Sequence, residues 1–277
     1  MKKRKALIFV NKIKDPEYKC LGDLQAALKS NDIEYSIIDE NAAPKKEGDF
    51  DALFVIGGDG TILRRTEFAN LSGVPIIGIN AGKLGFLSEF EQSEIGEAVK
   101  MLVQNELVKE ERATLEIDYN GNKYFALNDL VIQRIYDSNK SASGMVIMST
   151  VKVDDDSIGP IIGDGVIICT PTGSTAYSLS VGGAILAPGI NAFSVTPIAA
   201  HSFAQRPIIY SANSAFEASY DGGASAGLFV DGRMVAVLNK GDVAKIKKAD
   251  KPTLFFRRKA CAFYTKLSCK LKDRAGF

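Results

Sequence analysis

The first hundred residues alternate between short apolar runs and amphipathic segments, and this alternation most constrains the fold. The runs that predict strands cover residues 6–10, 34–38, 51–56 and 74–79. The segments whose apolar side chains or boundary signals predict helices are 16–30, 61–70 and 91–104. Strands that alternate with helices form a mostly parallel sheet covered on both faces. The sequence therefore predicts an N-terminal α/β nucleotide-binding domain over residues 1–104.

After residue 105 the pattern changes to short β-branched runs separated by Gly, Asn and Asp. These runs cover residues 114–119, 123–134, 145–153, 165–170, 207–211, 227–230, 243–248 and 253–256. Such a pattern predicts a mainly β C-terminal domain over residues 105–257. A chain of 277 residues fits two domains. We expect the basic tail, residues 258–277, to be able to pack back on the first domain.

Composition excludes several classes of protein. The formal net charge of +1 argues against nucleic-acid binding, which usually needs a strongly basic face. The single histidine, His201, excludes HExxH zinc sites. The four cysteines form no CxxC pair, so neither a zinc knuckle nor a disulfide framework is expected. The apolar run after the basic start has five residues, fewer than a signal peptide needs, and no run approaches a membrane span. We therefore expect a cytoplasmic protein without a membrane partner.

The sharpest local motif is Gly-Gly-Asp-Gly-Thr at residues 57–61, directly after an apolar strand. Backbone N–H groups of glycines and a helix N-terminus can cradle a phosphate, although an ordinary strand-to-helix turn is the alternative. An aspartate repels anions, so the presence of Asp59 indicates a specific role, which is to hold a metal ion, orient a hydroxyl or accept a proton. Phosphoryl transfer tolerates a weak base because its transition state is loose.

Two further segments carry candidate chemistry. Residues 163–183 contain Gly-Asp-Gly, an apolar strand and then a turn rich in hydroxyls, which predicts either a ligand-facing helix start or merely a capped one. The pair Asn128-Asp129 interrupts an apolar stretch. A ribose diol or an adenine edge would satisfy these polar groups, and a bend in the chain is the alternative. The run 154–156 of three aspartates predicts a solvated turn, with metal binding as its alternative.

Taken together, these motifs resemble those of the NAD kinase family. The resemblance covers GGDGT at 57–61, GINAGKLGFL at 78–87, Asn128-Asp129, GDGVIICTPTGSTAYSLSVGG at 163–183, His201-Ser202, Arg206-Pro207 and Asp231-Gly232, in the family order. GGDGT alone is shared with diacylglycerol and sphingosine kinases. The long TPTGSTAYSLS block is far more specific, and it decides the resemblance.

The resemblance implies a two-domain fold with the active site between the domains, and it implies roles for particular residues. Asp59 matches the proposed proton acceptor for the adenosine-ribose 2′-hydroxyl, and Gly60 and Arg64 lie with it at the dinucleotide site. Asn128 and Asp129 match the pair that binds NAD. The other implied NAD contacts are Asp164, Thr175, Ala176, Tyr177, Ser178, Leu179, Ser180, Ala199 and Arg233.

The implied reaction is transfer of the γ-phosphoryl of ATP to the 2′-hydroxyl of NAD, giving NADP and ADP. The resemblance also implies Mg²⁺, a homodimer or homotetramer, and ATP or polyphosphate as donor. The alternatives are a lipid kinase of the diacylglycerol or sphingosine type and a non-catalytic NAD-binding module. Four positions depart from the common family pattern: Lys83 is often His, Asp129 often Glu, Ile162 often basic and Arg233 often Gln.

Overall fold

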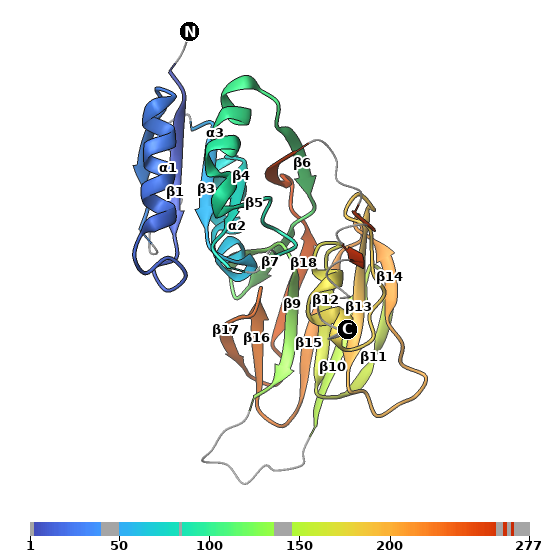
Figure 1. Cartoon of the computed structure of the whole chain (residues 1–277). Helices are drawn as coiled ribbons and strands as arrows, with labels where there is room; N and C mark the ends of the chain where they lie inside the picture. Colours follow the sequence, from blue (N-terminus) through green and yellow to red (C-terminus); the bar gives the residue numbers. More distant parts are fainter. Residues whose placement is uncertain are drawn as a thin grey trace. The chain divides into compact units, whose positions relative to one another are not determined.

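The computed structural model describes residues 3–39, 50–82, 85–135, 146–258, 263–264 and 267–268. The chain divides into two compact units, which we describe separately. The first comprises residues 1–111 and 253–277, and the second residues 112–252. Figure 1 labels most of their helices and strands, which are numbered in chain order.

The first unit is an α/β layer structure around a largely parallel sheet. Its elements are β1 (Lys5–Val10), α1 (Lys19–Ser30), β2 (Glu34–Ile37), β3 (Ala52–Ile56), α2 (Asp59–Ser72), β4 (Ile76–Asn80), β5 (Phe90–Glu91), the short 3₁₀ helix η1 (Gln92–Glu94), α3 (Ile95–Gln104), β6 (Val108–Arg112) and β19 (Thr253–Arg257). The sheet order is β2-β1-β3-β4-β19-β6, and β5 pairs with β4. β1 pairs in parallel with β2 and β3, β3 with β4, and β4 with β5 and β19.

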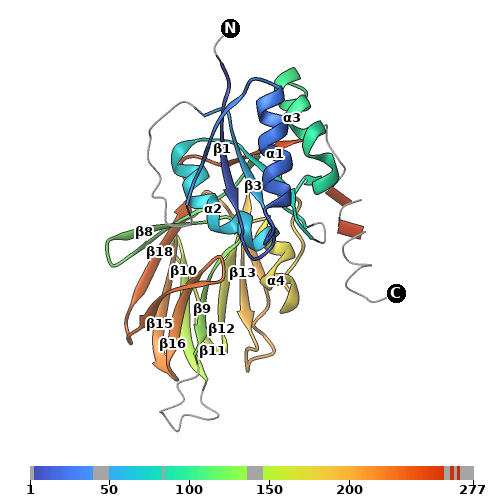
Figure 2. The same ribbon diagram turned by 60° about the vertical axis from the view of Figure 1, so that its left-hand side comes forward.

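Both faces of this sheet are buried, which explains the continuous apolar runs in the sequence. Ala6, Ile8 and Val10 of β1 pack in one core with α1 and α3, which lie side by side (Figure 2). The alternate residues Leu7 and Phe9 are also buried. Because β2 and β3 lie on opposite sides of β1, the connections diverge between β1 and β3. Ligands of open α/β sheets bind at such a point, beyond the carboxyl ends of the strands.

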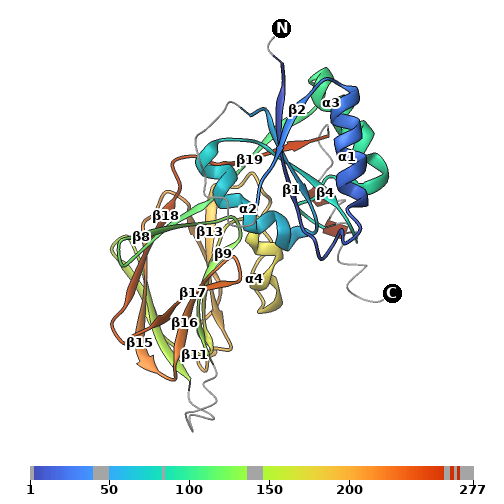
Figure 3. The same cartoon turned by 90° about the vertical axis from the view of Figure 1, so that its left-hand side faces the viewer.

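The second unit consists of two antiparallel six-stranded sheets, of order β11-β10-β15-β18-β7-β8 and β14-β13-β12-β9-β16-β17; Figure 3 shows strands of both. Its elements are β7 (Leu115–Tyr119), β8 (Asn122–Ala126), β9 (Asp129–Arg134), β10 (Ile147–Val153), β11 (Asp156–Gly163), β12 (Gly165–Cys169), η2 (Gly173–Thr175), α4 (Tyr177–Ser180), β13 (Ala192–Ile198), β14 (Ile208–Ser211), β15 (Phe216–Gly223), β16 (Ala226–Val230), β17 (Arg233–Leu238) and β18 (Val243–Lys248).

The two sheets share one apolar core, so they form a sandwich. Along β12, Val166 and Ile168 belong to this shared core. Ile167 and Cys169 point to the other side of the sheet, where Tyr177 and Val181 pack on them. This strand is therefore apolar throughout although its sheet is antiparallel, because the segment after it folds back as a cover.

The predicted fold class is confirmed: an α/β first unit and a mainly β second unit. Besides the short β5, five of the described strands were not predicted, namely 108–112, 156–163, 192–198, 216–223 and 233–238. Several contain Gly, Pro or alternating polar residues, and their pairing partners rather than their propensity make them strands. The predicted run 123–134 is two strands, β8 and β9, separated by a bend at Leu127 and Asn128.

The observed division of the chain differs from the predicted one at two places. Residues 105–111 belong to the first unit, and so does β19, which the sequence pattern placed with the β-rich region. β19 lies in the first sheet because it pairs in parallel with the buried strand β4, where Phe255 aligns with Ile76. Asp154 and Asp155 form an exposed tight turn between β10 and β11, whereas Asp156, the third residue of the predicted turn, begins β11. In the part of the chain that the structure describes, no helix has the length and apolar character needed to cross a membrane.

Candidate active site

The GGDGT segment joins β3 to α2 at the carboxyl end of the first sheet. The N–H of Gly57 donates to the carbonyl oxygen of Ile79 at 2.9 Å. Helix α2 begins at Asp59, two residues earlier than predicted, with Gly58 as its N-cap. Next to it, the Asn11 side chain at the end of β1 donates to the Thr61 hydroxyl at 2.9 Å. The turn is thus tied to both neighbouring strands while the start of α2 carries its partial positive charge.

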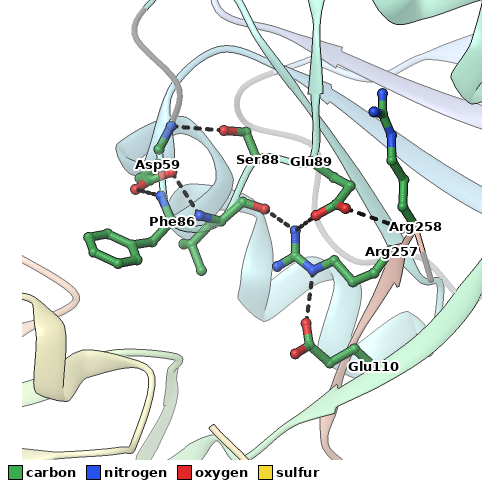
Figure 4. Close-up of polar contacts among 9 residues, drawn as sticks. Asp59, Phe86, Ser88, Glu89, Glu110, Arg257 and Arg258 are labelled. Carbon is green, nitrogen blue, oxygen red and sulfur yellow. Dashed lines mark hydrogen bonds and ion pairs between the residues drawn. The ribbon is translucent and has the colours of Figure 1, made fainter. Parts of the chain in front are cut away.

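The Asp59 carboxylate is held by the segment of residues 85–88 (Figure 4). The N–H of Phe86 donates to Oδ2 at 2.7 Å and the N–H of Leu87 to Oδ1 at 3.0 Å. Gly85 lies so close that an added Cβ would overlap the carboxylate. The side chain is partly buried. Its orientation is therefore set by two backbone donors that belong to the GINAGKLGFL motif.

Two other expected residues of this unit lie on the first turns of α2. Gly60 and Arg64 are exposed on the helix surface. Apart from its chain neighbours and the nearby backbone of α2, no atom lies within 4 Å of the position that a Cβ at Gly60 would take. Asp59 and Gly60 therefore begin α2, and the cation of Arg64 follows Asp59 by five residues on the same helix.

In the second unit, Asp231 shapes the turn that carries the Asn128-Asp129 pair. Its carboxylate accepts the N–H groups of three consecutive residues, Leu127 at 2.9 Å, Asn128 at 2.8 Å and Asp129 at 3.1 Å. In return, the Asp231 N–H donates to the Asp129 carbonyl oxygen at 3.0 Å. The Asn128-Asp129 pair lies at a bend in the chain, which was the structural alternative to ligand binding. The bend leaves Asn128 partly exposed.

Asp129 and Asp231 place two carboxyl groups in a buried environment. Burial, followed by the negative charge of Asp231, raises the pKa of Asp129 to about 7. Burial also raises the pKa of Asp231 to about 6, although its three N–H donors and the nearby Arg233 oppose that rise. Near neutral pH the Asp129 carboxyl therefore exchanges between a protonated donor and an ionised acceptor.

The hydroxyl-rich block, residues 170–180, is stabilised mainly by hydrogen bonds between its own hydroxyl groups and nearby backbone groups. Thr170 donates through its N–H to the Asn128 carbonyl oxygen at 2.9 Å, and its hydroxyl accepts the N–H of Gly173 at 3.2 Å. An added Cβ at Gly173 would overlap the backbone of Asn128. Within the expected stretch, Thr175 and Ser178 are buried, Ser180 is exposed, and Ala176, Tyr177 and Leu179 are partly buried. The block thus packs directly against the Asn128 turn.

The remaining expected residues lie around the Gly-Asp-Gly segment. Arg134 forms an ion pair with Asp164, Nη2 to Oδ1 at 3.1 Å. The Asp164 N–H donates to the carbonyl oxygen of Ile198, next to the exposed Ala199. Burial, followed by the charges of Asp164 and Asp129, raises the pKa of Tyr177. Tyr177 therefore lies within electrostatic range of both carboxylates.

Comparisons with known proteins agree with this arrangement. Residues 7–107 match the sequence profile of the ATP-NAD kinase N-terminal domain, and residues 127–258 match that of the ATP-NAD kinase C-terminal domain. The chain belongs to the NAD kinase family. The NAD kinase of Carboxydothermus hydrogenoformans is 36% identical over 253 residues, which cover 87% of this chain and 86% of that protein. The NAD kinase of Gemmatimonas aurantiaca is 33% identical, covering 86% of this chain and 82% of that protein.

Two solved structures are similar in fold to this chain. The NAD kinase of Archaeoglobus fulgidus in complex with ATP covers 92% of this chain and 94% of its own, with a TM-score of 0.74 and 26% identity. Yeast NADH kinase complexed with NADH covers 93% of this chain and 84% of its own, with a TM-score of 0.80. At 22% identity, the yeast structure supports the fold alone.

Four residues that contribute to the site have no role predicted from the sequence: Asn11, Phe86, Leu87 and Asp231. Asp231 belongs to a motif of the family resemblance, but no role was predicted for it. Asn11 is a polar residue directly after an apolar strand, and this pattern could have indicated a site residue at the end of that strand. The Phe86 and Leu87 donors are backbone groups, so no side-chain pattern points to them. Of the departures from the family pattern, Ile162 is partly exposed at 38% and Lys83 lies outside the described residues.

Proposed function

We propose that this chain catalyses transfer of the γ-phosphoryl of ATP to the 2′-hydroxyl of the adenosine ribose of NAD, forming NADP and ADP. The observation that carries the proposal is an aspartate at a helix N-terminus, directly after two glycines, whose carboxylate is oriented by two backbone N–H groups. Family membership supports the same reaction. The backbone of residues 57–60 would cradle phosphates, because a helix N-terminus offers free N–H donors there.

Asp59 is the proposed acceptor of the hydroxyl proton. An ionised carboxylate offers about four acceptor sites, so two remain after Phe86 and Leu87 have donated. A ribose hydroxyl can therefore bind to Asp59 without displacing either donor. The loose transition state of phosphoryl transfer lets the proton leave late, which suits a carboxylate.

The proposed NAD contacts in the second unit are those of the family resemblance: Asn128, Asp129, Asp164, residues 175–180, Ala199 and Arg233. The Asn128 amide can pair with an adenine edge or a ribose hydroxyl, and Asp129 can donate or accept near neutral pH. Arg233 lies near Asp231 and is exposed, so it is our candidate for the new 2′-phosphate in place of Ile162. Gly60 and Arg64 complete the proposed set in the first unit.

Mg²⁺ would enter this reaction with ATP rather than as a resident ion. Among the described residues, no group of three or more His, Cys, Asp or Glu side chains could hold a metal. Mg²⁺ is commonly held by substrate phosphates and water with only one or two carboxylates. We therefore propose that Mg²⁺ binds as a Mg·ATP substrate complex, in which the ion offsets phosphate charge.

The deciding experiment is a coupled assay in which an NADP-specific dehydrogenase reports the product. Purified protein is given ATP or polyphosphate with NAD or NADH, and a parallel reaction offers ATP with a diacylglycerol. We expect NADP and ADP in equal amounts from ATP and NAD. Phosphorylated diacylglycerol without NADP would favour a lipid kinase. NAD binding without release of ADP would favour a non-catalytic NAD-binding module.

The role of Asp59 is tested by Asp59→Asn. We expect the variant to keep the fold and to lose turnover by about 10²-fold or more, since a general base commonly contributes 10²–10⁴-fold. Thermal unfolding, compared with the wild type, serves as the control for folding. Formation of NADP at a near wild-type rate would show that Asp59 is not the proton acceptor.

We also propose a homodimer or homotetramer in the cytoplasm. On the edge strand β14, Ile208 and Ile209 are 39% and 47% exposed, as expected of a strand that contacts a second copy. Cys20 and Cys169 are free thiols, which suits a reducing compartment. Light scattering after size-exclusion chromatography measures the assembly, and a monomer at micromolar concentration would contradict it.

A further inference from the structure

The segment that holds Asp59 is itself held from its far side by Arg257 (Figure 4). The Arg257 Nη1 donates to the Leu87 carbonyl oxygen at 2.6 Å. The Leu87 N–H donates in turn to Asp59 at 3.0 Å. Leu87 is therefore fixed at both ends, by the proposed base on one side and by a guanidinium on the other.

The fold explains how a residue from the end of the chain reaches this loop. β19 runs parallel to β4, and Phe255 aligns with Ile76. Two residues further along these strands come Arg257 and Gly78. The carbonyl oxygen of Gly78 accepts the N–H of Glu89 at 3.0 Å, so the loop runs beside this point. A Cβ at Gly78 would press on the backbone of Leu87 and Ser88, so the loop lies directly on β4.

The position of Arg257 is itself strongly determined. Its Nε donates to Glu110 at 2.8 Å, its Nη1 lies 3.4 Å from Glu89, and the guanidinium covers the Phe255 ring at 4.6 Å. The side chains of Arg257 and Glu89 are only 9% and 4% exposed. Charge-assisted hydrogen bonds of this kind are short, strong and directional, and a planar guanidinium fixes several partners at once. A lysine cannot reproduce this geometry.

We propose that Arg257 is a positioning residue for the phosphoryl-transfer reaction: through Leu87 it holds the two N–H groups that orient Asp59. It touches no substrate in this role. This inference rests on the proposed function of Asp59 as proton acceptor. It also gives β19, the last strand in the described part of the chain, a role in turnover, because this strand completes the support of a loop more than 160 residues earlier in the sequence.

Steady-state kinetics of Arg257→Gln, Arg257→Lys and Arg258→Gln test the proposal. Arg258 is the matched control, because its side chain pairs with Glu94 and covers Phe90 without contacting Leu87. We expect kcat of Arg257→Gln to fall by about 10- to 100-fold, as for a small displacement of a reacting group, with KM for ATP and NAD changed less than about threefold. Arg257→Lys should restore kcat only in part, and Arg258→Gln should stay close to wild type.

Hydrogen exchange at the Phe86 and Leu87 amides gives a readout that does not depend on activity. We expect exchange about tenfold faster or more in both Arg257 variants, and in Asp59→Asn, than in wild type or Arg258→Gln. If Arg257→Gln does not fold, kcat and amide exchange of Arg257→Lys alone test the proposal, because this variant keeps the positive charge beside Glu89 and Glu110. Unchanged exchange, or a kcat loss equal to that of Arg258→Gln, would overturn the proposal.

Failure of the inference and failure of the proposed function give different results. If wild-type protein forms no NADP, or Asp59→Asn is as active as wild type, the proposed function fails. If Asp59→Asn is inactive while Arg257→Gln is fully active with unchanged amide exchange, only the positioning role of Arg257 is wrong.

Discussion

Three aspartates in the described part of the chain each accept two or more backbone N–H groups from a helix start or a loop. Asp15 accepts those of Cys20 and Leu21, Asp59 those of Phe86 and Leu87, and Asp231 those of Leu127, Asn128 and Asp129. Hydrogen bonds to a charged acceptor are stronger than neutral ones and fix loops that have no regular structure. The segments held by Asp59 and Asp231 belong to the proposed active site, and Asp15 holds the first turn of α1.

Gly85 offers a test at this scale. In Gly85→Ala the new Cβ would displace the Asp59 carboxylate. We expect kcat to fall by about 10- to 100-fold, because misplacing a reacting group costs about that much. Gly96→Ala is the matched control, since no atom lies within 4 Å of its added Cβ. Equal kcat values for the two variants would show that this contact does not orient Asp59.

Among the elements, helix α1 shows how a loop residue decides where a helix starts. The Asp15-Pro16 signal predicts a start at residue 16, but α1 begins at Lys19 after Tyr18 in a left-handed conformation. The buried Asp15 carboxylate reaches the N–H groups of Cys20 at 3.2 Å and Leu21 at 3.0 Å. It thus satisfies donors of the first turn from outside the helix, as a capping residue does.

The variant Asp15→Ala measures how much the Asp15 carboxylate stabilises the start of α1. We expect the free energy of unfolding to fall by about 1–2 kcal/mol, as for loss of a helix cap. Urea denaturation of the variant is compared with that of Asp23→Ala, which removes an exposed carboxylate from the same helix. If both variants lose the same stability, general charge effects rather than capping by Asp15 explain the change.

At the scale of the whole molecule, two aspartates make the stability of the second unit depend on pH. The second unit buries Asp129 and Asp231, whose pKa values are raised to about 7 and about 6. Between the ordinary aspartate pKa and these values, the folded state binds more protons than the unfolded state. These groups therefore make the free energy of unfolding fall as pH rises from about 4 to about 7.

The variant Asp129→Asn measures how much Asp129 contributes to the pH dependence of stability. Because each pKa unit corresponds to about 1.4 kcal/mol, ionising Asp129 costs the folded state at most about 4 kcal/mol. We expect the variant to be more stable than wild type at pH 8 and to show a flatter dependence between pH 4 and 7. Urea unfolding at several pH values is the measurement. A variant with the wild-type slope would show that Asp129 does not carry this linkage.

Which parts of the fold and the site could be predicted from the sequence depends on whether the interactions that form them are local. The spacing of apolar residues and the Gly-rich turns are features of short stretches of sequence. They therefore predicted the α/β first unit, the β-rich second unit and the GGDGT turn. The TPTGSTAYSLS block indicated the family for a similar reason: it is contiguous. Strands such as β11 and β13 escaped prediction because Gly and Pro weaken their local signal, and only their partners make them strands.

The sequence by itself thus determined the class of each unit and the identity of Asp59, Asn128 and Asp129 as candidates. The tertiary structure alone decided what holds them: the Phe86 and Leu87 amides at Asp59, Asp231 at the Asn128 turn and Arg257 behind Leu87. The physical reason is that backbone donors carry no residue-type signal. Their position depends on register between strands far apart in the chain, such as β4 and β19.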